Sequence, residues 1–159
     1  MKFNSKNGML HLDEPSEFAI YRGRTRQSLL KEFHNFERKW EKKIDQQTEI
    51  FLSPGKLKDR QVSLDLFFLY DALERVAFYW VDGQFSKYST DWDSIVEHWD
   101  LAEKDHMDTI DWLTELLERE PDEIMSIGAK WIYPWGSVDT WCETRSFTTG
   151  WSILWASQI

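Results

Sequence analysis

The chain has 159 residues, of which 42% are hydrophobic and 16% aromatic, so it can bury a core and is not a disordered acidic segment. Its net charge of −9 argues against a nucleic-acid-binding surface, and its single cysteine, Cys142, excludes an intrachain disulfide. No apolar run approaches the roughly 20 residues of a membrane helix, so we expect one cytosolic domain covering residues 1–159.

The N-terminal segments Phe3–Leu12 and Glu17–Tyr21 are short and apolar, and turn signals lie at Asn7-Gly8 and Glu14-Pro15. This pattern predicts a small hairpin.

A helical stripe follows the hairpin. Thr25 is a suitable N-cap, and the apolar residues after it, Leu29, Phe33, Phe36, Trp40 and Ile44, recur at three- and four-residue steps. We therefore expect a first helix from Thr25 to about Gln46.

The segment from Val62 to Val81 is dense enough in apolar residues for a buried helix or for two strands. Its enrichment in Val, Phe, Tyr and Trp favours two strands that turn near Asp71-Ala72. A third short strand is expected at Gln84–Tyr88, after the turn signal Asp82-Gly83.

An acidic helix is the most distinctive feature of the sequence. Between Asp91 and Glu123 there are thirteen acidic residues and two basic ones, a local balance of 2 − 13 = −11. We expect the helix to begin after Ser89, Thr90 or Asp91 and to run to about Arg119, roughly 42 Å. Ile95, Trp99, Ala102, His106, Ile110, Leu113 and Leu117 form its apolar stripe, so the acidic side should face solvent.

Two alternating patterns close the chain. Val138, Thr140 and Cys142 share one face of a strand, and Trp151, Ile153 and Trp155 share one face of the next. The predicted fold is therefore α+β: a single domain with an antiparallel sheet built from hairpins and two main helices.

The sequence offers no motif for catalysis, a metal or a cofactor. His98 and His106 are too far apart on one helix to share a metal, and His106 falls in the apolar stripe. Cys142 lies among strand residues without a catalytic motif, which predicts a buried, inert thiol. The seven glycines are scattered and form no phosphate-binding loop.

Binding to a protein partner fits the acidic helix better. Its carboxylates would attract a cationic surface, and aromatic residues near Pro134-Gly136 are typical contact residues. The predicted partner-binding residues are Asp93, Glu97, Asp100, Asp108, Asp111, Glu115 and Glu118 on the helix, with Trp131, Trp135 and Trp141.

Several segments in order resemble small bacterial immunity proteins of polymorphic and contact-dependent growth inhibition toxin systems. They are the Phe3-x-x-Lys-Asn-Gly-x-Leu opening, Leu66-Phe67-Phe68 with Leu73-x-x-Val76, Asp111-Trp112-Leu113, Tyr133-Pro134-Trp135-Gly136-Ser137-Val138, Glu143-Thr144-Arg145 and Gly150–Trp155. Glu143 stands where the group's pattern has Asp.

The resemblance implies a non-enzymatic cytoplasmic protein that neutralises a cognate toxin domain, commonly a nuclease, without binding nucleic acid itself. One alternative is an antirestriction protein that mimics DNA, although residues 1–60 carry thirteen basic against nine acidic residues. Another is a glycan-acting enzyme that uses some of the ten tryptophans and two carboxylates. The sequence gives no indication of the oligomeric state.

Overall fold

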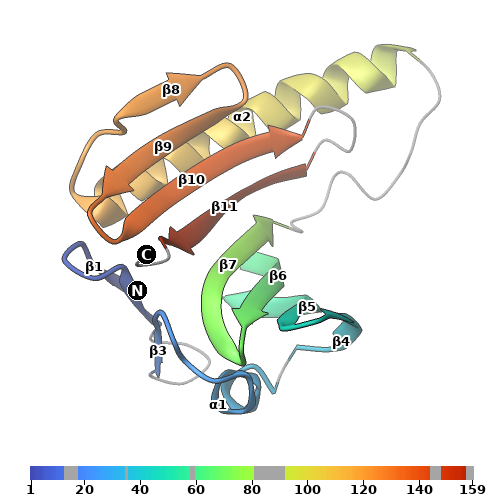
Figure 1. The fold of residues 1–159 in the computed structure, drawn as a ribbon. Helices are drawn as coiled ribbons and strands as arrows, with labels where there is room; N and C mark the ends of the chain where they lie inside the picture. Colours follow the sequence, from blue (N-terminus) through green and yellow to red (C-terminus); the bar gives the residue numbers. More distant parts are fainter. Residues whose placement is uncertain (13–17, 35, 58–59, 81–91, 144–147, 157–159) are drawn as a thin grey trace.

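The computed structural model describes residues 1–12, 18–34, 36–57, 60–80, 92–143 and 148–156. It contains a three-stranded sheet in the order β1-β2-β3 and an eight-stranded sheet in the order β4-β5-β6-β7-β11-β10-β9-β8 (Figure 1). Every strand pair is antiparallel. The α+β class with an antiparallel sheet is therefore confirmed.

The small sheet comprises β1 (Lys2–Asn4), β2 (Met9–Leu12) and β3 (Phe18–Ile20). The β1–β2 turn contains Asn7 and Gly8, as predicted, and Gly8 has a φ of 70°. A Cβ at Gly8 would lie 2.6 Å from the Trp135 ring, so the turn can pack this closely only with glycine. The Trp135 indole donates a hydrogen bond to the carbonyl of Ser5.

The first helix is much shorter than predicted. α1 spans Arg26–Glu32, with Thr25 as its N-cap accepting from the Ser28 amide, and Phe33 is its C-cap. The expected continuation to Gln46 is wrong, because Arg38–Ile44 forms strand β4. Phe36, Trp40 and Ile44 are four residues apart, and a four-residue step keeps side chains on one face of a strand as well as of a helix.

The central hairpins lie where the strand interpretation put them. β5 spans Gln47–Leu57, β6 Arg60–Leu69 and β7 Ala72–Trp80. Tyr70 and Asp71 connect β6 to β7 and both have positive φ, as a two-residue type I′ turn requires. Gln84–Tyr88, the expected third strand, lies outside the described residues.

The second helix, α2, spans Trp92–Leu117 and is about 39 Å long by its rise per residue. Its expected capping residues, Ser89 to Asp91, lie outside the described residues. β8 (Glu123–Met125), β9 (Gly128–Tyr133), β10 (Gly136–Glu143) and β11 (Thr148–Trp155) follow it. α2 packs against β10 and β11 on one side of the large sheet (Figure 1).

The core lies between the large sheet and the elements that cover this side. Trp151 stacks on Phe78 and meets Trp112 of α2 edge to face. His106 is buried, as predicted, and its Nε2 lies 3.1 Å from Thr140 Oγ1. Burial lowers the pKa of His106 and raises that of Cys142, so the imidazole favours its neutral form and the thiol stays protonated.

Candidate functional site

The acidic side of α2 faces solvent in the part of the helix whose side chains are described. We call this side the acidic surface; its described members are Asp100, Asp108, Asp111, Glu115 and Glu118, all exposed. The side chains of Asp93 and Glu97 lie outside the described residues. The opposite stripe, with Ala102, Ile110, Leu113 and Leu117, is buried as predicted. The helix therefore anchors to the sheet through one side and presents carboxylates on the other.

The three tryptophans predicted to contact a partner have different environments. Trp131 is fully buried, and its indole donates to the Arg119 carbonyl, so the structure excludes it as a surface contact. Trp135 is half-buried against the β1–β2 turn. Trp141 is half-buried on the side of the large sheet that faces away from α2. Trp131 was misassigned because it lies on the core-facing side of β9, opposite Val138.

That second side of the large sheet is the candidate site that the sequence did not reveal. Side chains alternate between the two faces of a strand. Ile153 and Trp155 are buried on the side that α2 covers, so Leu154 between them lies on the other side, where it is 44% exposed. We call this side the open face. Its apolar and aromatic side chains include Trp40, Ile44, Phe51, Phe67, Tyr79, Ile132, Trp141 and Leu154, and its charged side chains include Lys42, Glu49, Asp65, Arg75, Lys130 and Asp139.

A row of aromatic side chains crosses the open face from β4 to β10. Trp40 stacks on Phe51, with ring centroids 5.8 Å apart, and Phe51 meets Tyr79 edge to face. Tyr79 in turn meets Trp141 at 5.3 Å. Trp141 lies over Gly150, where a Cβ would come within 2.7 Å of the indole. Trp40, which the sequence placed on the apolar stripe of a first helix, is 43% exposed on β4, an edge strand.

A charged cluster lies beside this row. Arg75 Nη2 is 3.3 Å from Asp65 Oδ2 and 3.7 Å from Glu49 Oε1. The guanidinium also lies 5.8 Å from the centroid of the Phe67 ring. The three charged residues come from β5, β6 and β7. Glu49 and Arg75 both lie opposite Phe67 in the register, one on each side of it, and Asp65 lies two residues before Phe67 on β6. We call Glu49, Asp65 and Arg75 the charged cluster.

Asp65 is the most constrained member of the charged cluster. It is only 6% exposed, and its Oδ1 has no hydrogen-bond partner. Burial, and then the negative charge of Glu49, raise its pKa to about 6, although the Arg75 guanidinium acts in the opposite direction. The same burial raises the pKa of neighbouring Tyr79. Around neutral pH the cluster therefore holds two carboxylates against one guanidinium.

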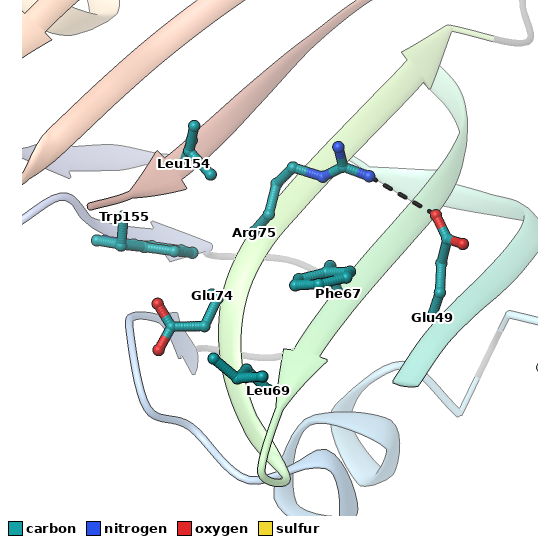
Figure 2. Close-up of a pocket in the computed structure, with 7 residues that line it drawn as sticks. All are labelled: Glu49, Phe67, Leu69, Glu74, Arg75, Leu154 and Trp155. Carbon is teal, nitrogen blue, oxygen red and sulfur yellow. Dashed lines mark ion pairs between the residues drawn. The ribbon is translucent and has the colours of Figure 1, made fainter. Parts of the chain in front are cut away.

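A hollow of about 410 Å³ opens where β11 ends beside β7. It is lined by Glu49, Phe67, Leu69, Glu74, Arg75, Leu154 and Trp155. Figure 2 shows the Arg75 side chain extending from β7 toward Glu49 on β5. The ring of Phe67, from β6, is seen below the Arg75 side chain. Glu74 is engaged separately, in an ion pair with Arg22. The hollow is lined by both charged and apolar side chains, which suits a side chain of a protein partner.

Other kinds of site find little support. Among the described residues, no group of three or more His, Cys, Asp or Glu is arranged to hold a metal ion. No helix in the described ranges is both long enough and apolar enough to cross a membrane.

Comparisons with known proteins give one informative match. No protein-family model matches the chain, and no curated protein matches it. The fold is similar to a chain in the solved structure of "Rhs1-CT in complex with cognate immunity protein RhsI1". The TM-score is 0.54 at 16% sequence identity, over 100% of this chain and 89% of the matched one. At this identity the match establishes a shared fold.

Proposed function

We propose that this protein is a non-enzymatic immunity protein, which binds a cognate bacterial toxin domain and blocks it by covering part of its surface. The observation that carries the proposal is the fold match, which spans the whole chain and involves the structure of an immunity complex. The independent sequence resemblance to immunity proteins of polymorphic and contact-dependent toxin systems points to the same role.

The chemistry of the described residues is consistent with a binding role. Among the described side chains, the buried imidazole is that of His106, in the core beside Thr140, and Cys142 is a buried thiol with a raised pKa. Neither group is a candidate for general acid–base or nucleophilic catalysis, because neither reaches a solvent-accessible site.

The charge of the molecule supports a cationic toxin. A nuclease must offer a positively charged groove to its substrate, and the acidic surface of α2 would be attracted to such a groove. We therefore propose a basic nuclease as the toxin class and the cytoplasm as the place of action. Attraction of the toxin toward Asp93, Glu97 and the acidic surface is part of this proposal.

The test is to tag the protein, express it in its native bacterium under mild conditions and identify stoichiometric partners by mass spectrometry. We expect the C-terminal domain of a large toxin. Expression of that domain alone should then stop growth, and coexpression with this protein should restore it. A clean, partnerless protein would contradict the proposal, and recovery of a restriction enzyme whose binding DNA competes away would favour a DNA mimic instead.

A further inference from the structure

We infer that the toxin domain docks on the open face of the large sheet, and that one of its cationic side chains binds at the charged cluster of Glu49, Asp65 and Arg75. The inference rests on the proposed function and specifies its contact surface. It also moves the main contact away from the acidic surface, because α2 packs on the opposite side of the sheet.

The apolar part of the open face is too extensive for an ordinary solvent-facing sheet. Trp40, Ile44, Ile132 and Leu154 are each at least 43% exposed, and they come from three strands of one sheet, β4, β9 and β11. Phe51, Phe67 and Trp141 lie between them and are half-buried. Exposed apolar and aromatic side chains with charged side chains among them are typical of protein interfaces.

The dimensions of the open face also suit a protein partner. Its side chains come from β4, β5, β6, β7, β11, β10 and β9, seven neighbouring strands. At about 4.8 Å per strand these span roughly 29 Å, and the four cross-strand rows span about 20 Å along the strands. The product, roughly 580 Å², is of the same order as the contact area of about 800 Å² per partner in a standard protein complex.

The charged cluster determines which chemistry the partner should bring. Two carboxylates share one guanidinium, so the cluster has one unbalanced negative charge when Asp65 is ionised. Lys42 lies opposite Glu49 in the register, but it is exposed on an edge strand, where solvent screens its charge. A Lys or Arg from the toxin, shielded from water by the surrounding aromatic side chains, would supply the missing charge.

Asp65 provides a second, independent indication of a ligand. A carboxylate that is more than nine-tenths buried and has an unpaired oxygen destabilises the free protein. An arriving cationic side chain would relieve the excess negative charge of Glu49 and Asp65.

The experiment uses the toxin domain identified by co-purification and the full chain. Dissociation constants would be measured by calorimetry for Glu49→Gln and Leu154→Ala on the open face. The matched controls are Glu103→Gln and Met107→Ala, which remove the same kinds of exposed group from α2 at positions outside the acidic surface. Thermal unfolding of each variant would confirm that it is folded.

We expect each open-face variant to weaken binding at least tenfold and each α2 control to change it less than twofold. A toxin variant with the docking Lys or Arg changed to Glu should recover at least tenfold in affinity when paired with Glu49→Lys. Wild-type affinity for both open-face variants would overturn the docking surface but leave the immunity function standing. A wild-type chain that binds no toxin domain would overturn both.

A measurement on the wild-type chain guards against variants that fail to fold. Trp40 is 43% exposed on the open face and Met107 is 52% exposed on α2, so both react with hydroxyl radicals in the free protein. In the complex, oxidation of Trp40 should fall at least fivefold while oxidation of Met107 is unchanged. Protection of Met107 with Trp40 unchanged would contradict the inference.

Discussion

At the scale of single residues, Asp65 couples the stability of the protein to pH. Its pKa of about 6 in the folded state lies above the value of 3.8 in an unfolded chain. The folded state therefore holds a proton that the unfolded state has released between these values, and folding is favoured at the lower pH. The stabilisation is complete below about pH 4 and is lost as the pH rises through 6.

Asp65→Asn should remove this dependence. We expect the variant to be more stable than the wild type at pH 7.5, by on the order of 2–3 kcal/mol, from a pKa difference of about two units. At pH 4.5 the difference should fall to about 1 kcal/mol. Urea unfolding of both proteins from pH 4.5 to 7.5 measures the difference in their free energies of unfolding. The contributions of the other carboxylates are the same in both proteins and cancel in this difference. Parallel stability curves would show that Asp65 has an ordinary pKa.

Two tryptophans that the sequence placed in one group should respond differently to truncation. Trp131 is fully buried, so Trp131→Ala should destabilise the protein by about 3–5 kcal/mol. Trp141 is half-buried over Gly150, and Trp141→Ala should cost about 1–2 kcal/mol. Denaturant unfolding would measure both, and equal losses would contradict the assignment of Trp131 to the core and Trp141 to the open face.

Individual core residues were predictable where the local pattern had one interpretation. Trp151 and Trp155 alternate with Ile153 on a short strand, and all three are buried. Trp40 and Trp131 were assigned wrongly, because their exposure depends on the neighbouring strands in the sheet. β4 is an edge strand and β9 lies between β8 and β10, and neither position can be inferred from the residues near each tryptophan.

At the scale of elements, the acidic surface should destabilise the helix that carries it. Asp108, Asp111, Glu115 and Glu118 follow at three- or four-residue steps, where like charges repel. The last turn contains no basic residue and so leaves the negative end of the helix dipole uncompensated.

Glu115→Lys should therefore stabilise the protein. Replacing an exposed acid near the C-terminus of α2 removes two repulsive pairs and improves the interaction with the helix dipole, in total about 0.5–1 kcal/mol. The melting temperature at low ionic strength measures the gain, and Asp100→Lys, far from the last turn, is the control with a smaller effect. An unchanged or lower melting temperature for Glu115→Lys would argue against this electrostatic account of α2.

The elements differ in how far their sequences determine them. The stretch from Val62 to Val81 contains aromatic and β-branched residues on both faces, and strand propensity gave the right answer for β6 and β7. The apolar residues from Thr25 to Ile44 have a spacing that fits a helix as well as a strand. Arg38–Ile44 forms a strand because it pairs with β5. The open face was not predictable, because it depends on β11 pairing with β7, about 75 residues earlier.

At the scale of the whole molecule, the acidic surface and the open face lie on opposite sides of the large sheet. In an immunity complex they would therefore contribute to different steps. Exposed charges outside a contact act mainly on the association rate, whereas buried charge pairs and apolar contacts act mainly on dissociation. The net charge of −9 makes the first effect substantial for a cationic toxin.

The kinetics of toxin binding should separate the two roles. Changing Asp100, Asp108 and Asp111 together to Lys raises the net charge from −9 to −3, so association should slow several-fold at low salt with little change in the dissociation rate. Leu154→Ala should speed dissociation at least tenfold and leave association nearly unchanged. Stopped-flow measurements at about 20 and 300 mM salt test both, because high salt should remove only the first effect. Faster dissociation of the triple α2 variant at both salt concentrations would instead place the acidic surface within the contact.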